Sequence, residues 1–255
     1  MGPWQAAAVL AAGVGAGAIN AVVGSGTLLT FPTLLALGYP PVTANVSNTI
    51  GLVFGGVTAT WGYRRELEGQ RPRLLRLAPL SFVGSLTGAL LLLRLPAEAF
   101  AAIVPALLAV SVVLVLAQPR IAAAVQRRRE VAGRHDGRVG VPASVGTLLA
   151  GVYGGYFGAA QGVLLIGVLG AVLTESLQRV NAAKNLLSLI VNLVAAVTFL
   201  VVRPSAVDPV VVALIAVGSL LGGLLGAGVG RALSPGVLRA VVAIVGVVAI
   251  VRLLA

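Results

Sequence analysis

The chain contains no cysteine and only one histidine among its 255 residues. A disulfide framework and a thiolate metal site are therefore excluded, and zinc chemistry is disfavoured. Charge is also scarce, because Asp, Glu, Lys and Arg make up only 10% of the residues. The apolar segments contain no pair of carboxylates, no Ser-His-Asp set with a credible base and no phosphate-binding P-loop. We therefore expect neither an enzyme nor a nucleotide-driven pump, and no cofactor.

Hydrophobic residues, in contrast, make up 58% of the chain, and the mean hydropathy is +1.05. Apolar runs of the length that crosses about 30 Å of hydrocarbon recur along the whole sequence. The N-terminal run has no Arg or Lys ahead of it, so we expect a retained first helix rather than a cleaved signal. The composition predicts an all-α integral membrane protein that crosses the cytoplasmic (inner) membrane many times.

The net charge of +11 is concentrated in two segments, with five arginines in 64–76 and six in 120–138. Positively charged loops stay on the cytoplasmic side, where they can also contact anionic headgroups of the lipid bilayer, so we expect no nucleic-acid partner. We predict a first transmembrane repeat over 1–117, a basic cytoplasmic loop over 118–138 and a second transmembrane repeat over 139–255.

The two repeats are suggested by a weak internal match. Sliding the chain by 138 residues pairs five positions in order, namely Gly13 with Gly151, Gly17 with Gly155, Gly24 with Gly162, Val42 with Val180 and Ala44 with Ala182. The segment 201–209 matches the first arginine loop but has no cytoplasmic bias, which predicts that the second repeat is inverted.

Each repeat contains one apolar run too short for a full crossing, at 27–38 and at 163–173. Short, Gly- or Pro-interrupted runs at matching positions indicate discontinuous helices and a binding site near the bilayer midplane. We therefore expect eight to ten membrane segments, and whether the short helices re-enter or cross stays open.

Glycines before the short runs allow the helix to break where the backbone lines a cavity. Gly24, Ser25 and Gly26 form the first break, and Gln161 and Gly162 end the second. A helix that starts after such a break points free N–H groups into the cavity and favours an anion. The earlier glycines, Gly13, Gly17, Gly151 and Gly155, are expected to serve close helix packing instead.

Polar residues follow at the start of the next helix in each repeat. The first repeat has Asn45, Ser47 and Asn48, and the second has Lys184 and Asn185 in the matching segment. Helix capping by Thr43 or Asn45 and by Asn181 would explain part of this pattern. Lys184 is the only lysine, and an ionisable residue that enters a membrane segment is a functional candidate.

The segments GAINAVVGSGTLLTFPTLLALGYPPVTANVSNTIGLVFGG, GVYGGYFGAAQGVLLIGVLG and QRVNAAKNLLSLIVN resemble the TauE/SafE family of membrane permeases, also called sulfite exporters. The resemblance covers nearly the whole chain. Many members have three consecutive glycines where this chain has Gly24-Ser25-Gly26, and the second copy, Ala160-Gln161-Gly162, keeps only one. The resemblance implies secondary transport of a small sulfur-containing or carboxylate anion.

Together these features predict a permease that moves sulfite or an organosulfonate by alternating access. The substrate-binding residues would be Gly24, Ser25, Gly26, Asn45, Ser47, Asn48, Gln161, Gly162, Lys184 and Asn185. The coupling ion, a proton or sodium, the direction of transport and assembly into a homo-oligomer stay open. The alternatives are a cation or metal permease, and a membrane scaffold or accessory subunit without transport.

Overall fold

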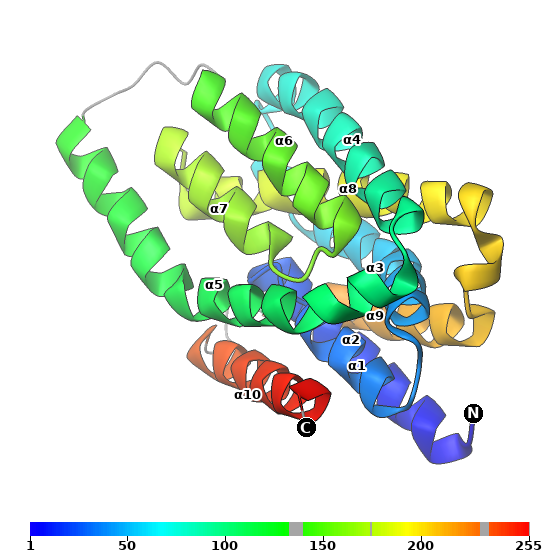
Figure 1. The fold of residues 1–255 in the computed structure, drawn as a ribbon. Coiled ribbons are helices and arrows are strands. Elements are labelled where there is room, and N and C mark those ends of the chain that lie inside the picture. Colours follow the sequence, from blue (N-terminus) through cyan, green and yellow to red (C-terminus); the bar gives the residue numbers. More distant parts are fainter. Residues whose placement is uncertain (133–139, 174, 230–234, 255) are drawn as a thin grey trace.

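The computed structural model describes residues 1–132, 140–173, 175–229 and 235–254, and every regular element in these ranges is helical. The first half contains α1 (Pro3–Val22), α2 (Thr27–Ala36), α3 (Pro41–Gly62), the short η1 (Arg64–Leu67), α4 (Arg71–Arg94) and α5 (Ala97–Ala132). The second half contains α6 (Val141–Tyr156), α7 (Gln161–Val172), α8 (Leu177–Val202), η2 (Pro204–Ala206), α9 (Pro209–Val229) and α10 (Pro235–Leu254). The expected all-α fold is confirmed (Figure 1).

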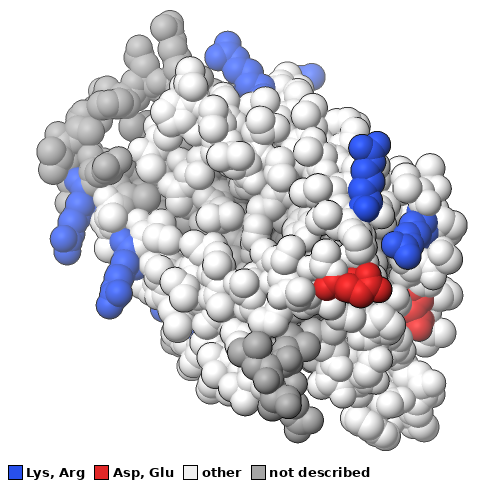
Figure 2. Space-filling model, viewed as in Figure 1, with Lys and Arg blue, Asp and Glu red and all other residues white. Residues whose placement is uncertain are grey.

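Five helical segments of the described chain are long and apolar enough to cross a membrane, as judged by length and composition. They are Pro3–Val22, Arg71–Arg94, Ala97–Ala124, Leu177–Val202 and Pro209–Gly228. Figure 2 shows a face that is largely uncharged, with basic side chains mostly toward its edges and acidic ones at the lower right. An uncharged middle between charged margins is what a bilayer requires, so the chain is a multi-pass membrane protein.

Two short helices follow breaks in longer ones. Residues 23–26 separate α1 from α2, which has 10 residues, and residues 157–160 separate α6 from α7, which has 12. Both short helices lie where the apolar runs predicted them. α7 begins at Gln161, so Gly162 lies inside its first turn rather than ahead of the helix.

Helices from the two halves pack on one another through small residues. α1 contacts α9, and α4 contacts α6 beside it (Figure 1). A Cβ atom added to Gly13 would lie 3.2 Å from Ile215 Cα, and one added to Gly151 would lie 3.1 Å from the Ser81 carbonyl oxygen. Added Cβ atoms at Gly17 and Gly155 would meet the backbone of α9 and α4. The packing role expected for these four glycines is confirmed.

The starts of α3 and α8 differ from the expected capping pattern. α3 begins at Pro41 after Pro40, and α8 begins at Leu177, where the Ser176 hydroxyl accepts a hydrogen bond from the Arg179 N–H. The prediction that Thr43, Asn45 and Asn181 are caps is therefore wrong, because each lies inside its helix. Their side chains are available for tertiary contacts instead.

The predicted basic loop at 118–138 is in large part helical, because α5 continues through it to Ala132. Residues 133–139 lie outside the described ranges.

Candidate functional site

The first helix break is fixed by one glycine and one asparagine. Gly24 has φ +85°, a left-handed conformation that side chains with a Cβ rarely adopt. The Asn20 side-chain oxygen accepts a hydrogen bond of 2.7 Å from the Gly26 N–H. The glycine lets the chain turn between α1 and α2, and the asparagine satisfies a backbone donor that the turn exposes.

The second break also turns at a glycine in the left-handed conformation, and aromatic rings pack beside it. Gly158 has φ +77°, and its N–H donates to the Tyr153 carbonyl at 3.0 Å. The ring of Phe157 packs edge-to-face on Phe31 of α2 at 5.2 Å between centroids, and Phe100 of α5 lies 6.2 Å from Phe157. Helices from both halves therefore hold this break in place.

The two breaks touch each other. The Gly162 N–H donates to the Gly24 carbonyl oxygen at 3.1 Å, and these residues stand 138 positions apart, at matching places in the two halves. A Cβ atom added to Gly24 would lie 2.5 Å from Gly162 Cα. Only glycine at both positions permits this approach.

The expectation of free N–H groups at the starts of the short helices is not met at the glycines. The Gly26 N–H is used by Asn20, and the Gly162 N–H is used by Gly24. At these two glycines, therefore, no N–H group is offered to a ligand, whereas the lining side chains and the positive dipole ends of α2 and α7 remain.

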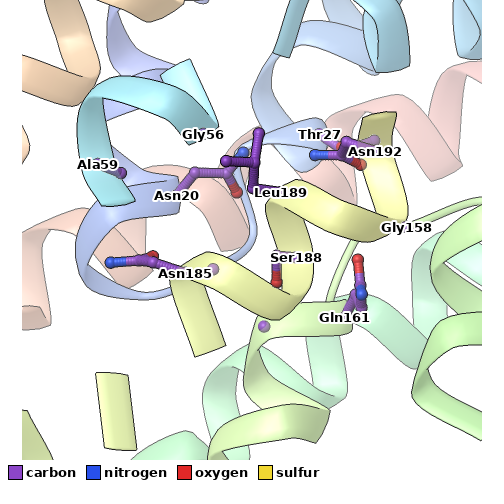
Figure 3. Close-up of a pocket in the computed structure, with 12 residues that line it drawn as sticks. Asn20, Thr27, Gly56, Ala59, Gly158, Gln161, Asn185, Ser188, Leu189 and Asn192 are labelled. Atoms are coloured by element: carbon purple, nitrogen blue, oxygen red, sulfur yellow. The ribbon is translucent and has the colours of Figure 1, made fainter. Parts of the chain in front are cut away.

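A polar cavity of about 30 Å³ lies at this meeting point, between α1, α2, α3, α7 and α8 (Figure 3). Its lining consists of amides, hydroxyls and small residues: Asn20, Gly24, Thr27, Gly56, Ala59, Gly158, Gln161, Gly162, Asn185, Ser188, Leu189 and Asn192. A buried water needs roughly 10–15 Å³, so the volume corresponds to about two waters.

Two lining side chains carry polar atoms without a protein partner. The Gln161 Nε2 amide and the Ser188 hydroxyl are buried and form no hydrogen bond within the described chain. They extend toward one another from α7 and α8 in Figure 3. Buried polar atoms are almost always paired, so these two are suited to a ligand or water in the cavity.

Gly154 makes room for Gln161, because a Cβ atom added there would lie 2.5 Å from the Gln161 Cδ atom. The position of this amide is therefore determined by α6 behind it.

Lys184 and two asparagines meet the end of α1. The Lys184 Nζ donates to the Asn20 carbonyl oxygen at 2.7 Å, and its side chain is fully buried. The Asn181 and Asn185 amides both donate to the Ala21 carbonyl oxygen, at 3.0 Å and 3.3 Å. Lys184 does not line the cavity, although its neighbour Asn185 does. Burial at 0% exposure also excludes the interfacial position that a long cationic side chain often takes.

The remaining predicted residues are buried near the breaks but outside the cavity lining. Asn45 donates to the Tyr156 carbonyl at 3.0 Å, at the end of α6. Asn48 donates to the Thr27 hydroxyl at 3.2 Å and accepts from the Thr30 hydroxyl, which joins α3 to α2. Ser25 is fully buried and its hydroxyl has no partner within the described chain. Gly26 completes the turn.

Ser47 points elsewhere. Its hydroxyl accepts a hydrogen bond of 2.9 Å from the Asp208 N–H, ahead of α9. Of the ten predicted site residues, Gly24, Gln161, Gly162 and Asn185 line the cavity.

Asn20, Thr27, Ser188 and Asn192 line the cavity but were not among the predicted site residues. A sequence signal existed for two of them. Asn185, Ser188 and Asn192 are spaced by three and four residues, so they share one face of α8. The polar stripe faces the cavity.

Polar contacts also join the halves at the two ends of α3. At the Gly62 end, Glu175 pairs with Arg73 at 3.3 Å and with Arg179 at 2.6 Å, and Arg179 donates to the Glu68 carbonyl at 2.9 Å. Glu175 and Arg179 are four residues apart in the chain, and Arg73 extends this local pair to α4.

At the Pro41 end of α3, the contacts are made by Tyr39 and Asp208. The pKa of Tyr39 is raised by partial burial and by the neighbouring Asp208 carboxylate, which also accepts a hydrogen bond from the phenol. With the Ser47 contact, these bonds connect the α2–α3 segment with the α8–α9 segment.

Within the described residues, no group of three or more His, Asp or Glu side chains lies close enough to hold a metal ion.

Comparison with known proteins gives a consistent result. The model of the family "Sulfite exporter TauE/SafE" matches residues 9–253. The "Probable membrane transporter protein YfcA" of Escherichia coli (strain K12) is 31% identical over 180 residues, which are 67% of this chain and 64% of the relative. The match therefore spans just under two thirds of the relative's length. The "Probable membrane transporter protein ORF9" of Sinorhizobium sp is 34% identical over 93 residues, 36% of each chain.

No solved structure matches the chain. Because the family model covers almost all of the sequence and the helices have the length and polarity of membrane spans, the chain belongs to the TauE/SafE family.

Proposed function

We propose that the protein is a secondary permease of the cytoplasmic membrane that moves a small anion through the cavity between the two helix breaks. The observation that carries the proposal is the polar cavity at the Gly24–Gly162 contact, with two lining side chains that carry buried polar atoms without protein partners. The names of the relatives, both called probable membrane transporters, support the class of function.

An anion is favoured by the chemistry of the lining. Its polar side chains are amides and hydroxyls, none of the lining residues is acidic, and the Gln161 amide offers an unused donor. The dipole ends of α2 and α7 add positive potential. A sulfur oxyanion such as sulfite or an organosulfonate accepts several hydrogen bonds around one centre, and it agrees with the family's description.

The transport cycle would use two inverted repeats, with eight to ten membrane segments. In such repeats α1, α2, α4 and α5 correspond to α6, α7, α9 and α10. The contacts support this arrangement, because α1 packs on α9 and its counterpart α6 packs on α4. In the same way, α2 packs on α10 and its counterpart α7 packs on α5. Rocking of one repeat against the other would open the cavity to alternate sides. The cavity has room for only about two waters, so it would widen when an oxyanion enters.

The direct test uses the purified full chain with sulfite, sulfate, isethionate and acetate. An anion that binds the folded protein raises its melting temperature, and the same anion should cross the membrane of proteoliposomes. Ser188→Ala should weaken binding and flux of that anion by about ten- to hundredfold, the scale of one lost hydrogen bond to a charged ligand.

Ser81→Ala is the matched control, because the Ser81 hydroxyl is also buried without a partner but lies outside the cavity. Equal effects of the two substitutions on anion flux would contradict the proposed site. A protein that binds none of the anions and copurifies with another membrane protein would instead be an accessory subunit.

A further inference from the structure

The C-terminal end of α1 is an electronegative place inside the protein. α1 ends at Val22, and the last carbonyls of a helix lack intrahelical partners and carry the negative end of the dipole. Two of these carbonyls, on Asn20 and Ala21, accept hydrogen bonds from α8. The donor to Asn20 is the Lys184 ammonium, at 2.7 Å.

In membrane transporters with broken helices, carbonyls at such a helix end commonly coordinate the cation that is coupled to transport. Here an ammonium group from the chain itself takes this place. The described chain provides no carboxylate partner for Lys184, because both ion pairs within it involve Glu175. The amino group of Lys184 is therefore directed at the helix end.

Hydrogen bonding alone does not require a charge at this position. At the end of α6, in the matching break, the Tyr156 carbonyl accepts from the neutral Asn45 amide at 3.0 Å. Ser47, which aligns with Lys184 when a one-residue gap is placed in the 138-residue offset, contacts Asp208 instead. At the first break, two neutral amides already donate hydrogen bonds to the Ala21 carbonyl oxygen. A neutral donor would therefore satisfy the Asn20 carbonyl as well, and an ammonium group there adds a charge that hydrogen bonding does not require.

The charge also lies close to the cavity without entering it. The Lys184 Cδ atom would be 3.1 Å from a Cβ atom on Gly24, and both Gly24 and Asn20 line the cavity. Lys184 can therefore hold the first break in shape and supply a positive potential to a bound anion, without being a ligand of it.

We propose that Lys184 is a tethered cation that replaces a coupling cation at the end of α1, so that anion transport needs no inorganic cation at this site. The inference rests on the proposed anion permease. It makes Lys184 a positioning residue and predicts that the site becomes dependent on an added cation when the ammonium group is removed.

The test compares wild type, Lys184→Ala and Lys184→Met in proteoliposomes with the anion identified above. Replacing Na⁺ and K⁺ by choline should leave wild-type flux unchanged. Lys184→Ala should lose flux by about ten- to hundredfold, the effect expected for one hydrogen bond to a charged group. Ammonium or methylammonium should restore flux in Lys184→Ala, because the truncation leaves space beside the Asn20 carbonyl. Lys184→Met is the matched control, since its side chain fills that space, and no amine should restore it.

The melting temperature in detergent is a second readout that needs no transport. Methylammonium should raise the melting temperature of Lys184→Ala but not that of wild type or Lys184→Met. If wild type carries none of the anions, the proposed function fails, whereas this amine-specific shift still supports a cation site at α1.

Two results would overturn the inference. One is wild-type flux that stops when Na⁺ and K⁺ are replaced by choline, a measurement that stands even if neither variant folds. The other is Lys184→Ala with full flux and no response of its melting temperature to ammonium or methylammonium.

Discussion

Substitution of Gly24 by alanine tests whether the two helix breaks meet as described. Two separate costs apply at this position. Its φ of +85° costs a residue with a Cβ roughly 1–2 kcal/mol. The new methyl group would also lie 2.5 Å from Gly162 Cα and 3.1 Å from Lys184 Cδ, and overpacking of this kind costs roughly 1–3 kcal/mol. The sum is about 2–5 kcal/mol.

Alanine substitutions at two further glycines separate the cost of the backbone conformation from the cost of overpacking. Gly38 has φ +88° with nothing within 4 Å of an added Cβ, so Gly38→Ala should lose only about 1–2 kcal/mol. Gly162 has no positive φ, but its added Cβ would meet the Gly24 backbone, so Gly162→Ala should lose about 1–3 kcal/mol. Gly24→Ala should therefore be the least stable of the three.

The assay is unfolding of the three variants in the same detergent, by heat and by titration with a denaturing detergent. For a chain of this size, about 1 kcal/mol corresponds to a shift in melting temperature of roughly 2–4 °C. If Gly24→Ala and Gly38→Ala are equally stable and Gly162→Ala resembles wild type, the breaks do not touch and the reasoning about the cavity fails with them.

Three other substitutions have defined expectations. Ser85→Ala removes a 2.6 Å interhelical hydrogen bond and should lower the free energy of unfolding by about 0.6–1.7 kcal/mol in a denaturing-detergent titration; no change would refute a role for that bond. Glu175→Gln removes both arginine pairs, which are partly exposed, so thermal unfolding should show a loss of about 1 kcal/mol or less, and a larger loss would contradict this account. Gly154→Ala should displace the Gln161 amide and weaken anion binding as Gln161→Ala does; normal binding by Gly154→Ala would show that the amide is not needed in its present position.

The main features of the fold follow from the sequence because they depend on composition and local pattern. Long apolar runs predict membrane helices, and glycines beside short runs predict the breaks at Gly24 and near Gly162. The packing glycines were also predictable, since small residues at a spacing of four permit close helix contact.

Long-range contacts at the site were not predictable in the same way. The repeat aligned Gly24 with Gly162 but gave no reason to expect the hydrogen bond between them. The partner of Lys184 is a backbone carbonyl on a helix 164 positions away, and a carbonyl has no sequence signature. The capping expectation failed for Asn181 because Ser176, a better-placed hydroxyl, begins the helix earlier.

The different polar contacts at the two ends of α3 have a consequence for how the protein responds to its medium. The Gly62 end is held by ion pairs among Glu175, Arg73 and Arg179, and the Pro41 end by hydrogen bonds of Tyr39 and Ser47 with Asp208. Dissolved salt weakens the attraction between exposed charges, and at 1 M it screens them over a distance of about 3 Å. It acts far less on hydrogen bonds. A rise in ionic strength on the side of the membrane that the Gly62 end of α3 faces would therefore weaken the contacts at that end and leave those at the Pro41 end in place.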